Sequence, residues 1–213
     1  MFTCLNWRRF LVENKNNGYS DASPKKRIVV VGIPGIGKTT VISRAAELLR
    51  QANQNTEIVV FGTLMFEESK KLGITNRDDL RNLSISQQRS LQEMAAQKIR
   101  SMQADVLLID THLFIKTVEG FYPGLPMHLI NALGPTHFVM IAADAQEIVN
   151  RRNSDKTRQR DLASVNEIET ELEISRIVVS CCSVISGSPF MIIINKENEI
   201  DKAASAIASM IGK

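Results

Sequence analysis

A glycine-rich stretch, G-I-P-G-I-G-K-T from Gly32 to Thr39, fits the pattern G-x-x-x-x-G-K-[ST]. Gly32 and Gly37 let the backbone approach a ligand where a Cβ atom would block it. Consecutive backbone N–H groups and the start of a following helix present partial positive charge to phosphate oxygens. Lys38 can reach the outer phosphates, and the Thr39 hydroxyl suits Mg²⁺. The motif therefore predicts a site for a nucleoside triphosphate with Mg²⁺.

A carboxylate follows the third apolar run of the chain, V-L-L-I-D, which ends at Asp110. In a parallel sheet the carboxyl ends of the strands meet at one edge, where ligands bind. Beside the glycine-rich loop, Asp110 is predicted to hold Mg²⁺ or its water ligand. An aspartate after a strand can also be only a helix cap or a loop residue.

Four arginines lie within ten residues after the fourth apolar run, and Asp161 closes the cluster. Guanidinium groups that close over a transferring phosphoryl group stabilise the charge on its oxygens. The cluster predicts a short arginine-rich lid at about residues 151–163, and its alternative is an ordinary solvated helix end. The arginines are Arg151, Arg152, Arg158 and Arg160.

A second polar set follows the second apolar run and could hold a phosphate acceptor. Gly62 and Thr63 come directly after it, and Arg77 and Arg81 follow further on. Residues four apart share a face of an α-helix, so the two arginines could grip one phosphate together. Pairing with the neighbouring aspartates or with an adjacent helix explains them equally well.

The base of the donor nucleotide is predicted to be adenine. Proteins that read guanine carry N-K-x-D, whose aspartate pairs with the exocyclic amine of the base. The chain has Asn195-Lys196-Glu197-Asn198, which resembles that motif without the final carboxylate.

Five short apolar runs alternate with longer helical patterns from Arg27 onward. Runs of this kind are typical of strands buried on both faces of a parallel sheet. Two S-x-x-[EQ] capping boxes, at Ser84 and Ser164, predict where two of the helices begin. The order predicts an α/β fold, a three-layer α/β/α sandwich with a five-stranded parallel sheet. Together with the glycine-rich motif, it predicts the P-loop NTPase type. The runs are Ile28–Val31, Ile58–Phe61, Val106–Ile109, Phe138–Ile141 and Phe190–Ile194.

Composition excludes several classes of protein. The 213 residues are 44% hydrophobic and 23% charged, close to the globular average. No apolar run reaches the roughly 20 residues of a membrane span. Three cysteines, two of them adjacent, cannot build a disulfide framework or a four-cysteine zinc site. We therefore expect a protein of a reducing compartment with no membrane partner.

The positive charge is concentrated at the N-terminus. Residues 1–27 hold six basic and two acidic side chains, a net charge of +4, whereas the other 186 residues have a net charge of −1. A body without net positive charge argues against duplex nucleic acid as the main partner. Residues 1–26 are predicted to be a flexible basic extension, with an organellar presequence as the alternative. Residues 27–213 are predicted to form the P-loop domain.

The chain from Arg27 to its C-terminus resembles the archaeal type of adenylate kinase. The resemblance is carried by five stretches in the order of that family: IVVVGIPGIGKTT, VVFGTLMFEESKKLGITNRDDLRNL, LLIDTHLFIKT, GFYPGLP and NRRNSDKTRQRDL. It implies reversible phosphoryl transfer, ATP + AMP to two ADP, with Mg²⁺, in a cytoplasmic homotrimer.

The resemblance also implies roles for individual residues. The ATP side would comprise Gly32, Ile33, Pro34, Gly35, Ile36, Gly37, Lys38, Thr39 and Thr40 around the phosphates, with Asn195 and Lys196 near the adenine. The AMP side would comprise Thr63, Arg77, Arg81, His112 and Lys116. Catalysis would rest on Lys38 and on the lid arginines Arg152, Arg158 and Arg160, and the metal on Thr39 and Asp110.

Two alternative functions remain open at this point. One keeps the chemistry and changes the acceptor to another nucleoside monophosphate. The other is a P-loop ATPase that acts as an assembly factor on ribonucleoprotein, with the basic N-terminal extension touching RNA phosphates.

Overall fold

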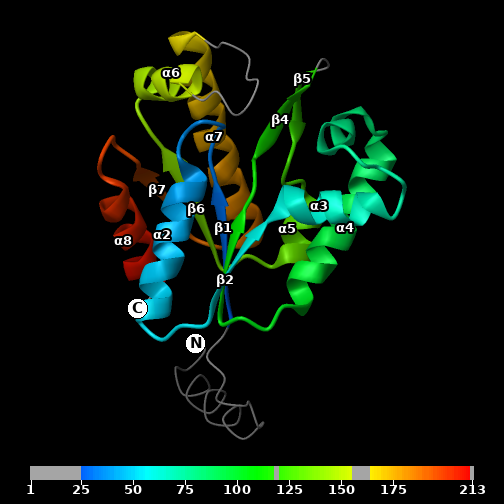
Figure 1. The fold of residues 1–213 in the computed structure, drawn as a ribbon, viewed down its shortest axis with the longest axis horizontal. Coiled ribbons are helices and arrows are strands. Elements are labelled where there is room, and N and C mark those ends of the chain that lie inside the picture. Colours follow the sequence, from blue (N-terminus) through cyan, green and yellow to red (C-terminus); the bar gives the residue numbers. More distant parts are fainter. Residues whose placement is uncertain (1–24, 118–119, 155–163, 212–213) are drawn as a thin grey trace, which may run out of the picture.

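The computed structural model describes residues 25–117, 120–154 and 164–211 (Figure 1). Almost all of the predicted N-terminal extension and most of the predicted lid, including Arg158 and Arg160, therefore lie outside the described residues. The two assignments stay predictions.

The body is built on a five-stranded parallel sheet with the strand order β2-β3-β1-β6-β7. The predicted fold class is confirmed by this topology. Each predicted run contributes a strand, with small shifts at the ends. The strands are β1 (Lys26–Val31), β2 (Thr56–Val60), β3 (Val106–Asp110), β6 (His137–Ala142) and β7 (Phe190–Ile194).

Helices cover both faces of the sheet (Figure 1). One face is covered by α2 (Lys38–Gln51) and α8 (Ile200–Ile211), and the other by α4 (Ile85–Ser101), α5 (Met127–Leu133) and α7 (Val165–Ser186). The other helices of the described residues are α3 (Phe61–Lys70), the 3₁₀ helix η2 (Arg77–Asn82) and α6 (Ala145–Ser154). Among the helices of the described segments, none is both long and apolar enough to cross a bilayer.

Both predicted capping boxes are present. The Ser84 hydroxyl accepts a hydrogen bond from the Gln87 backbone N–H, and the Gln87 side chain accepts one from the Ser84 N–H. Ser164 and Glu167 make the same reciprocal pair at the start of α7. Each box satisfies backbone donors that a helix start would otherwise leave unpaired, so it fixes the residue at which the helix begins.

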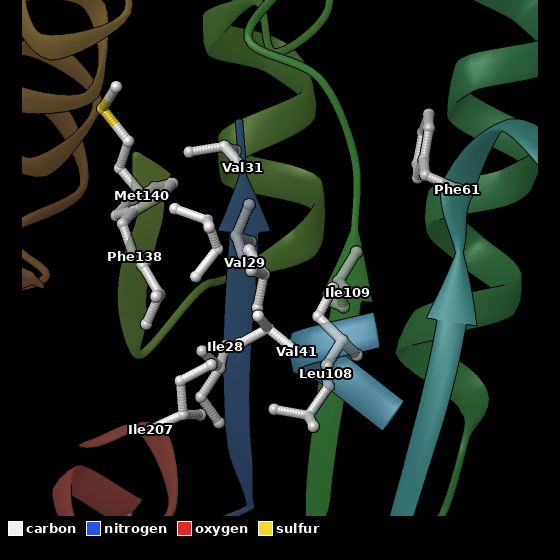
Figure 2. Close-up of a cluster of buried hydrophobic side chains, with 14 of the residues drawn as sticks. Ile28, Val29, Val31, Val41, Phe61, Leu108, Ile109, Phe138, Met140 and Ile207 are labelled. Atoms are coloured by element: carbon white, nitrogen blue, oxygen red, sulfur yellow. The ribbon is translucent and has the colours of Figure 1, made fainter. Parts of the chain in front are cut away.

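The core lies around the three central strands. In β1, Ile28 to Val31 are fully buried, and β3 and β6 are buried along nearly their whole length. Figure 2 shows Val29 of β1 between the side chains of its neighbouring strands, with Val41 of α2 and Ile207 of α8 contributing from the helices. This packing holds the carboxyl ends of β1, β3 and β6 in fixed positions.

Two sequence expectations about the sheet are corrected. Phe61 was expected in the second strand but begins α3. The run Phe190–Ile194 was expected to be buried on both faces, but β7 is an edge strand, and four of its five residues are exposed. An apolar run alone does not distinguish a central strand from an edge strand, because both can be continuous in β-branched residues.

One element was missed altogether. Strands β4 (Phe114–Thr117) and β5 (Gly120–Pro123) form a separate antiparallel pair. Each strand has only four residues, so neither gives a clear periodicity. The rings of Phe114 and Phe121 meet edge to face, with centroids 4.8 Å apart.

Adjacent phenylalanines on β6 and β7 provide a test of this core. Phe138 is fully buried and is in register with Phe190, which is 41% exposed. We expect Phe138→Ala to lower the free energy of unfolding by about 3–5 kcal/mol, because it removes a buried ring and leaves a cavity. Phe190→Ala, the matched control, should cost about 1 kcal/mol. Urea denaturation measures both, and equal losses would contradict the edge position of β7.

Candidate active site

The glycine-rich P-loop connects β1 to α2 at the carboxyl edge of the sheet. Gly35 and Gly37 have φ angles of 86° and 84°, in the left-handed region that favours glycine. Left-handed residues in such a turn help consecutive N–H groups converge on one concave side, which is a geometry that binds anions. A Cβ at Gly32 would lie 2.9 Å from the Ile141 carbonyl oxygen, so that position needs glycine because the loop passes close to β6.

Lys38 and Asp110 form a buried ion pair next to this loop. Lys38 Nζ lies 2.5 Å from Asp110 Oδ1 and donates to the Thr111 carbonyl at 2.5 Å. The two side chains are only 7% and 9% exposed. Burial lowers the pKa of Lys38, and the nearby carboxylate of Asp110 opposes that shift. The ammonium group is thus held by an anion at the place where a phosphate would enter.

The donors around Asp110 suit a hard divalent cation. The Thr39 hydroxyl donates to Asp110 Oδ2 at 3.4 Å, so two oxygen-bearing side chains from different elements meet here. Mg²⁺ prefers oxygen ligands and keeps several waters, and protein sites supply only one or two side chains in addition to phosphate oxygens. Thr39 and Asp110 fit that requirement. Within the described ranges there is no cluster of three or more His, Cys, Asp or Glu side chains that could hold a metal.

His112 lies beside the first residue of the P-loop. Its Nδ1 is 3.1 Å from the Gly32 carbonyl oxygen, an arrangement that requires the proton on Nδ1. Although the residue is exposed as a whole, the protein around the ring displaces water from it, and this desolvation and the charge of Lys38 lower the pKa of His112 to about 4. His112 is therefore neutral at neutral pH. A Cβ at Gly124 would lie 2.2 Å from the His112 carbonyl oxygen, so the G-L-P segment packs directly against this loop.

Arg152, expected in the lid, is bonded to the P-loop in this structure. Its Nε donates to the Pro34 carbonyl at 2.9 Å, and its Nη2 lies 3.1 Å from Glu171 Oε2 on α7. The two side chains are 10% and 13% exposed. Arg152 therefore lies at the loop, paired with a carboxylate, where it could reach a bound phosphate by a change of side-chain conformation.

Arg151 and Asn195 meet at another carbonyl of the same loop. Asn195 Nδ2 donates to the Ile36 carbonyl oxygen at 2.8 Å, and Arg151 Nη1 donates to the same oxygen at 3.3 Å. Arg151 also donates to the Asn195 carbonyl at 3.2 Å and pairs with Glu147 at 2.8 Å. Asn195 is 3% exposed, whereas Lys196 beside it is exposed.

The expected acceptor residues lie on the β2 side of the loop. The Arg77 guanidinium lies over Gly62, where its Nη2 is 2.9 Å from the position that a Cβ would occupy. Thr63 is exposed in the first turn of α3. One expectation is corrected: η2 is a 3₁₀ helix with three residues per turn, so a spacing of four does not place Arg77 and Arg81 on one face. The side chains of Arg81 and Lys116 lie outside the described residues.

The structure therefore brings together several of the expected residues around one loop, and it adds two that sequence reasoning missed. Thr111 contributes its carbonyl to Lys38, a role that no side-chain motif reveals. Glu171 pairs with Arg152, and its spacing offered a signal. It is four residues after the capping Glu167, so it lies near the same helix face, at the end of α7 that follows the arginine cluster.

The chain is similar to known proteins over most of its length. A family model described as an AAA domain matches residues 31–169. Curated adenylate kinases are similar over most of the chain. That of Methanocaldococcus jannaschii is 37% identical over 87% of this chain and 98% of its own length, and that of Thermoplasma acidophilum is 41% identical over 87% and 98%.

Solved structures show the same fold at low sequence identity. The crystal structure of shikimate kinase from Bacteroides thetaiotaomicron matches with a TM-score of 0.55 and 14% identity, over 88% of this chain and 99% of that one. Shikimate kinase from Acinetobacter baumannii matches with a TM-score of 0.52 and 18% identity, over 88% and 93%.

The lowered pKa of His112 predicts a pH dependence of stability. Between the ordinary value of 6.5 and about 4, the unfolded chain binds a proton at this residue and the folded chain does not, so stability falls as the pH drops through that range. We expect the loss of unfolding free energy between pH 7 and pH 5 to be smaller in His112→Asn than in the wild type. Urea denaturation at both pH values measures it. An identical loss in both proteins would show that the pKa of His112 is not lowered.

Proposed function

Because the chain belongs to the archaeal-type adenylate kinase family, we propose that it catalyses the reversible, Mg²⁺-dependent transfer of a phosphoryl group in ATP + AMP = 2 ADP. Membership makes it a nucleoside monophosphate kinase. The observation that carries the specific reaction is the arrangement at the sheet edge. A P-loop with a buried Lys38–Asp110 pair lies beside an arginine, Arg77, that faces the start of α3.

The donor nucleotide is held by the P-loop in this proposal. The N–H groups of the loop and of the first turn of α2 bind the phosphate oxygens. Lys38 exchanges its contact with Asp110 for one with the outer phosphates, which keeps the ammonium paired throughout. Residues Gly32 to Thr40 supply this half of the site, and Lys196 at the exposed end of β7 lies on the adenine side.

Mg²⁺ would be held by the Thr39 hydroxyl and, directly or through water, by the Asp110 carboxylate. When bound, the ion neutralises charge on the outer phosphates of the donor. Asp110 is freed for this task when Lys38 moves to the nucleotide. The two residues already lie within contact of each other in the structure.

The acceptor AMP is proposed to bind against α3 and η2. Arg77 grips its phosphate, Thr63 lines the same side, and Arg81 and Lys116 are proposed to complete it. His112 is neutral at physiological pH, so it contributes a hydrogen bond rather than charge. An AMP phosphate needs no base at neutral pH, and positioning and charge stabilisation therefore carry the catalysis.

The lid arginines are proposed to stabilise the transition state. Arg152 already contacts the P-loop, and exchange of Glu171 for the transferring phosphoryl group would bring its charge to the equatorial oxygens. Arg158 and Arg160 are proposed to close over the same group. The resemblance also supports, as part of the proposal, a cytoplasmic homotrimer in which residues 1–26 take no part in the chemistry.

The central test is phosphoryl transfer by the purified protein. We expect ADP to form from ATP and AMP with Mg²⁺, and Lys38→Ala to lower kcat by at least about 100-fold, because the residue that neutralises the outer phosphates is lost. Lys202→Ala, which removes an exposed lysine on α8, is the matched control and should retain wild-type kcat. A coupled assay for ADP measures all three proteins.

A panel of nucleoside monophosphates at equal concentration identifies the acceptor. The highest kcat/KM with AMP supports the proposal, and a higher value with another monophosphate would replace AMP as the acceptor. ATP hydrolysis without any acceptor, stimulated by RNA and lost on removal of residues 1–26, would instead indicate the assembly-factor ATPase.

Arg77 offers a test of the acceptor side alone. We expect Arg77→Ala to raise the KM for AMP by about 10- to 100-fold, the effect of losing a charge-assisted hydrogen bond, and to change the KM for ATP little. Arg100→Ala removes an exposed arginine in the last turn of α4 and serves as the control. Equal rises in both KM values would show that Arg77 does not belong to a separate acceptor site.

A further inference from the structure

Three alternate carbonyl groups of the P-loop are each bonded to a side chain that comes from outside the loop. The side chains belong to three different elements of the chain. The pairs are His112 Nδ1 with Gly32 O at 3.1 Å, Arg152 Nε with Pro34 O at 2.9 Å, and Asn195 Nδ2 with Ile36 O at 2.8 Å. The bond from Asn195 to the Ile36 carbonyl is the shortest of the three, and Asn195 is the most deeply buried of the three donor residues.

The orientation of a carbonyl determines the orientation of the next N–H group. In a trans peptide the two point in opposite directions, and the described residues contain no cis peptide bond. When Asn195 holds the Ile36 carbonyl, the N–H of Gly37 must therefore point away from Asn195. Within the described part of the chain, no hydrogen bond uses the Gly37 N–H. That group remains available to an anion in the concave side of the loop.

Asn195 is well placed to hold this peptide rigidly. Its backbone N–H donates to the Ala142 carbonyl at 2.7 Å, which extends the pairing of β6 and β7 by one residue. A Cβ at Gly37 would lie only 2.6 Å from Asn195 Nδ2, so the amide group packs directly against the loop. Arg151 reinforces the contact, because it bonds both the Ile36 carbonyl and the Asn195 carbonyl.

Packing alone does not explain an asparagine at this position. Asn195 Oδ1 is buried and has no hydrogen-bond partner among the described atoms. A buried amide oxygen without a partner is destabilising, and an apolar side chain of similar shape would avoid that cost. The donor group on the Ile36 carbonyl is the contact that an asparagine provides here and an apolar side chain would lack.

We propose that Asn195 is a positioning residue for the nucleotide phosphates, which acts by fixing the Ile36–Gly37 peptide so that the Gly37 N–H faces the phosphate site. The inference rests on the donor half of the proposed function and is independent of the acceptor. It differs from the sequence expectation that Asn195 lies near the adenine. Substitution of a residue that contacts the base weakens the binding only of ligands that carry a base. Substitution of a residue that orients the loop weakens the binding of bare polyphosphate to the same extent.

The test compares Mg-ATP with Mg-tripolyphosphate, a ligand without a base, by isothermal titration calorimetry. We expect Asn195→Ala and Asn195→Leu to weaken both ligands by a similar factor of about tenfold, the effect of losing one preformed hydrogen bond to phosphate. Glu197→Ala changes an exposed residue of the same loop and should leave both affinities unchanged. Asn195→Leu should also keep the thermal midpoint at or above the wild-type value, because it removes the unpaired oxygen.

Other binding and stability results would overturn the inference. Weaker binding of Mg-ATP with unchanged binding of Mg-tripolyphosphate would assign Asn195 to the adenine. Unchanged affinity for both ligands would show that the peptide needs no such support. Absence of tripolyphosphate binding by the wild type would contradict the premise that the loop binds phosphates without a base. Loss of the folded state in both variants would assign Asn195 a structural role. A wild type that binds both ligands but transfers no phosphoryl group to AMP contradicts the proposed function and leaves this inference intact.

Discussion

The buried ion pair between Lys38 and Asp110 is the contact on which the rest of the site depends. It joins the first residue of α2 to the last residue of β3, and both side chains are almost completely removed from water. Removal of one partner from such a pair typically costs about 3–5 kcal/mol, because a charge is left buried without compensation. The Lys38 ammonium therefore needs an anion at all times. Under the proposed function, a nucleotide phosphate replaces Asp110 as that anion, so the ion pair keeps the loop ready for the nucleotide.

The same edge of the sheet holds the loop from several directions. His112 follows β3, Arg152 lies on α6, and Asn195 follows β7, yet all three contact carbonyl groups within five residues of the P-loop. A glycine-rich loop is conformationally permissive, and fixing it has an entropic cost. Because packed elements already hold the loop, its conformational entropy is lost during folding and not when a nucleotide binds. The loop geometry thus depends on the assembly of the whole sheet, although its sequence motif is local.

Sequence reasoning succeeded where the physical signal is local or periodic. The motif of Gly32–Thr39, the capping boxes at Ser84 and Ser164 and the buried strands are all such signals. Sequence reasoning failed for structural features that depend on distant parts of the chain. The edge position of β7 follows from strand order, and the hairpin of β4 and β5 is too short to show a period. The partner of Arg152 is Glu171, nineteen residues away and on another helix. The spacing of Glu171 from Glu167 indicates its helix face but does not identify Arg152 as its partner.

The two halves of the proposed site differ in how far their residues are buried, and this difference bears on selectivity for the phosphate acceptor. On the P-loop side, Lys38, Asp110 and Asn195 are buried and bonded before any nucleotide binds. On the proposed acceptor side, Arg77 and Thr63 are exposed. Shikimate kinases share this fold at under 20% identity, and a shared fold does not by itself define a substrate. Under the proposed function, the choice of acceptor therefore depends on the side chains of α3 and η2, which can change without disturbing the P-loop.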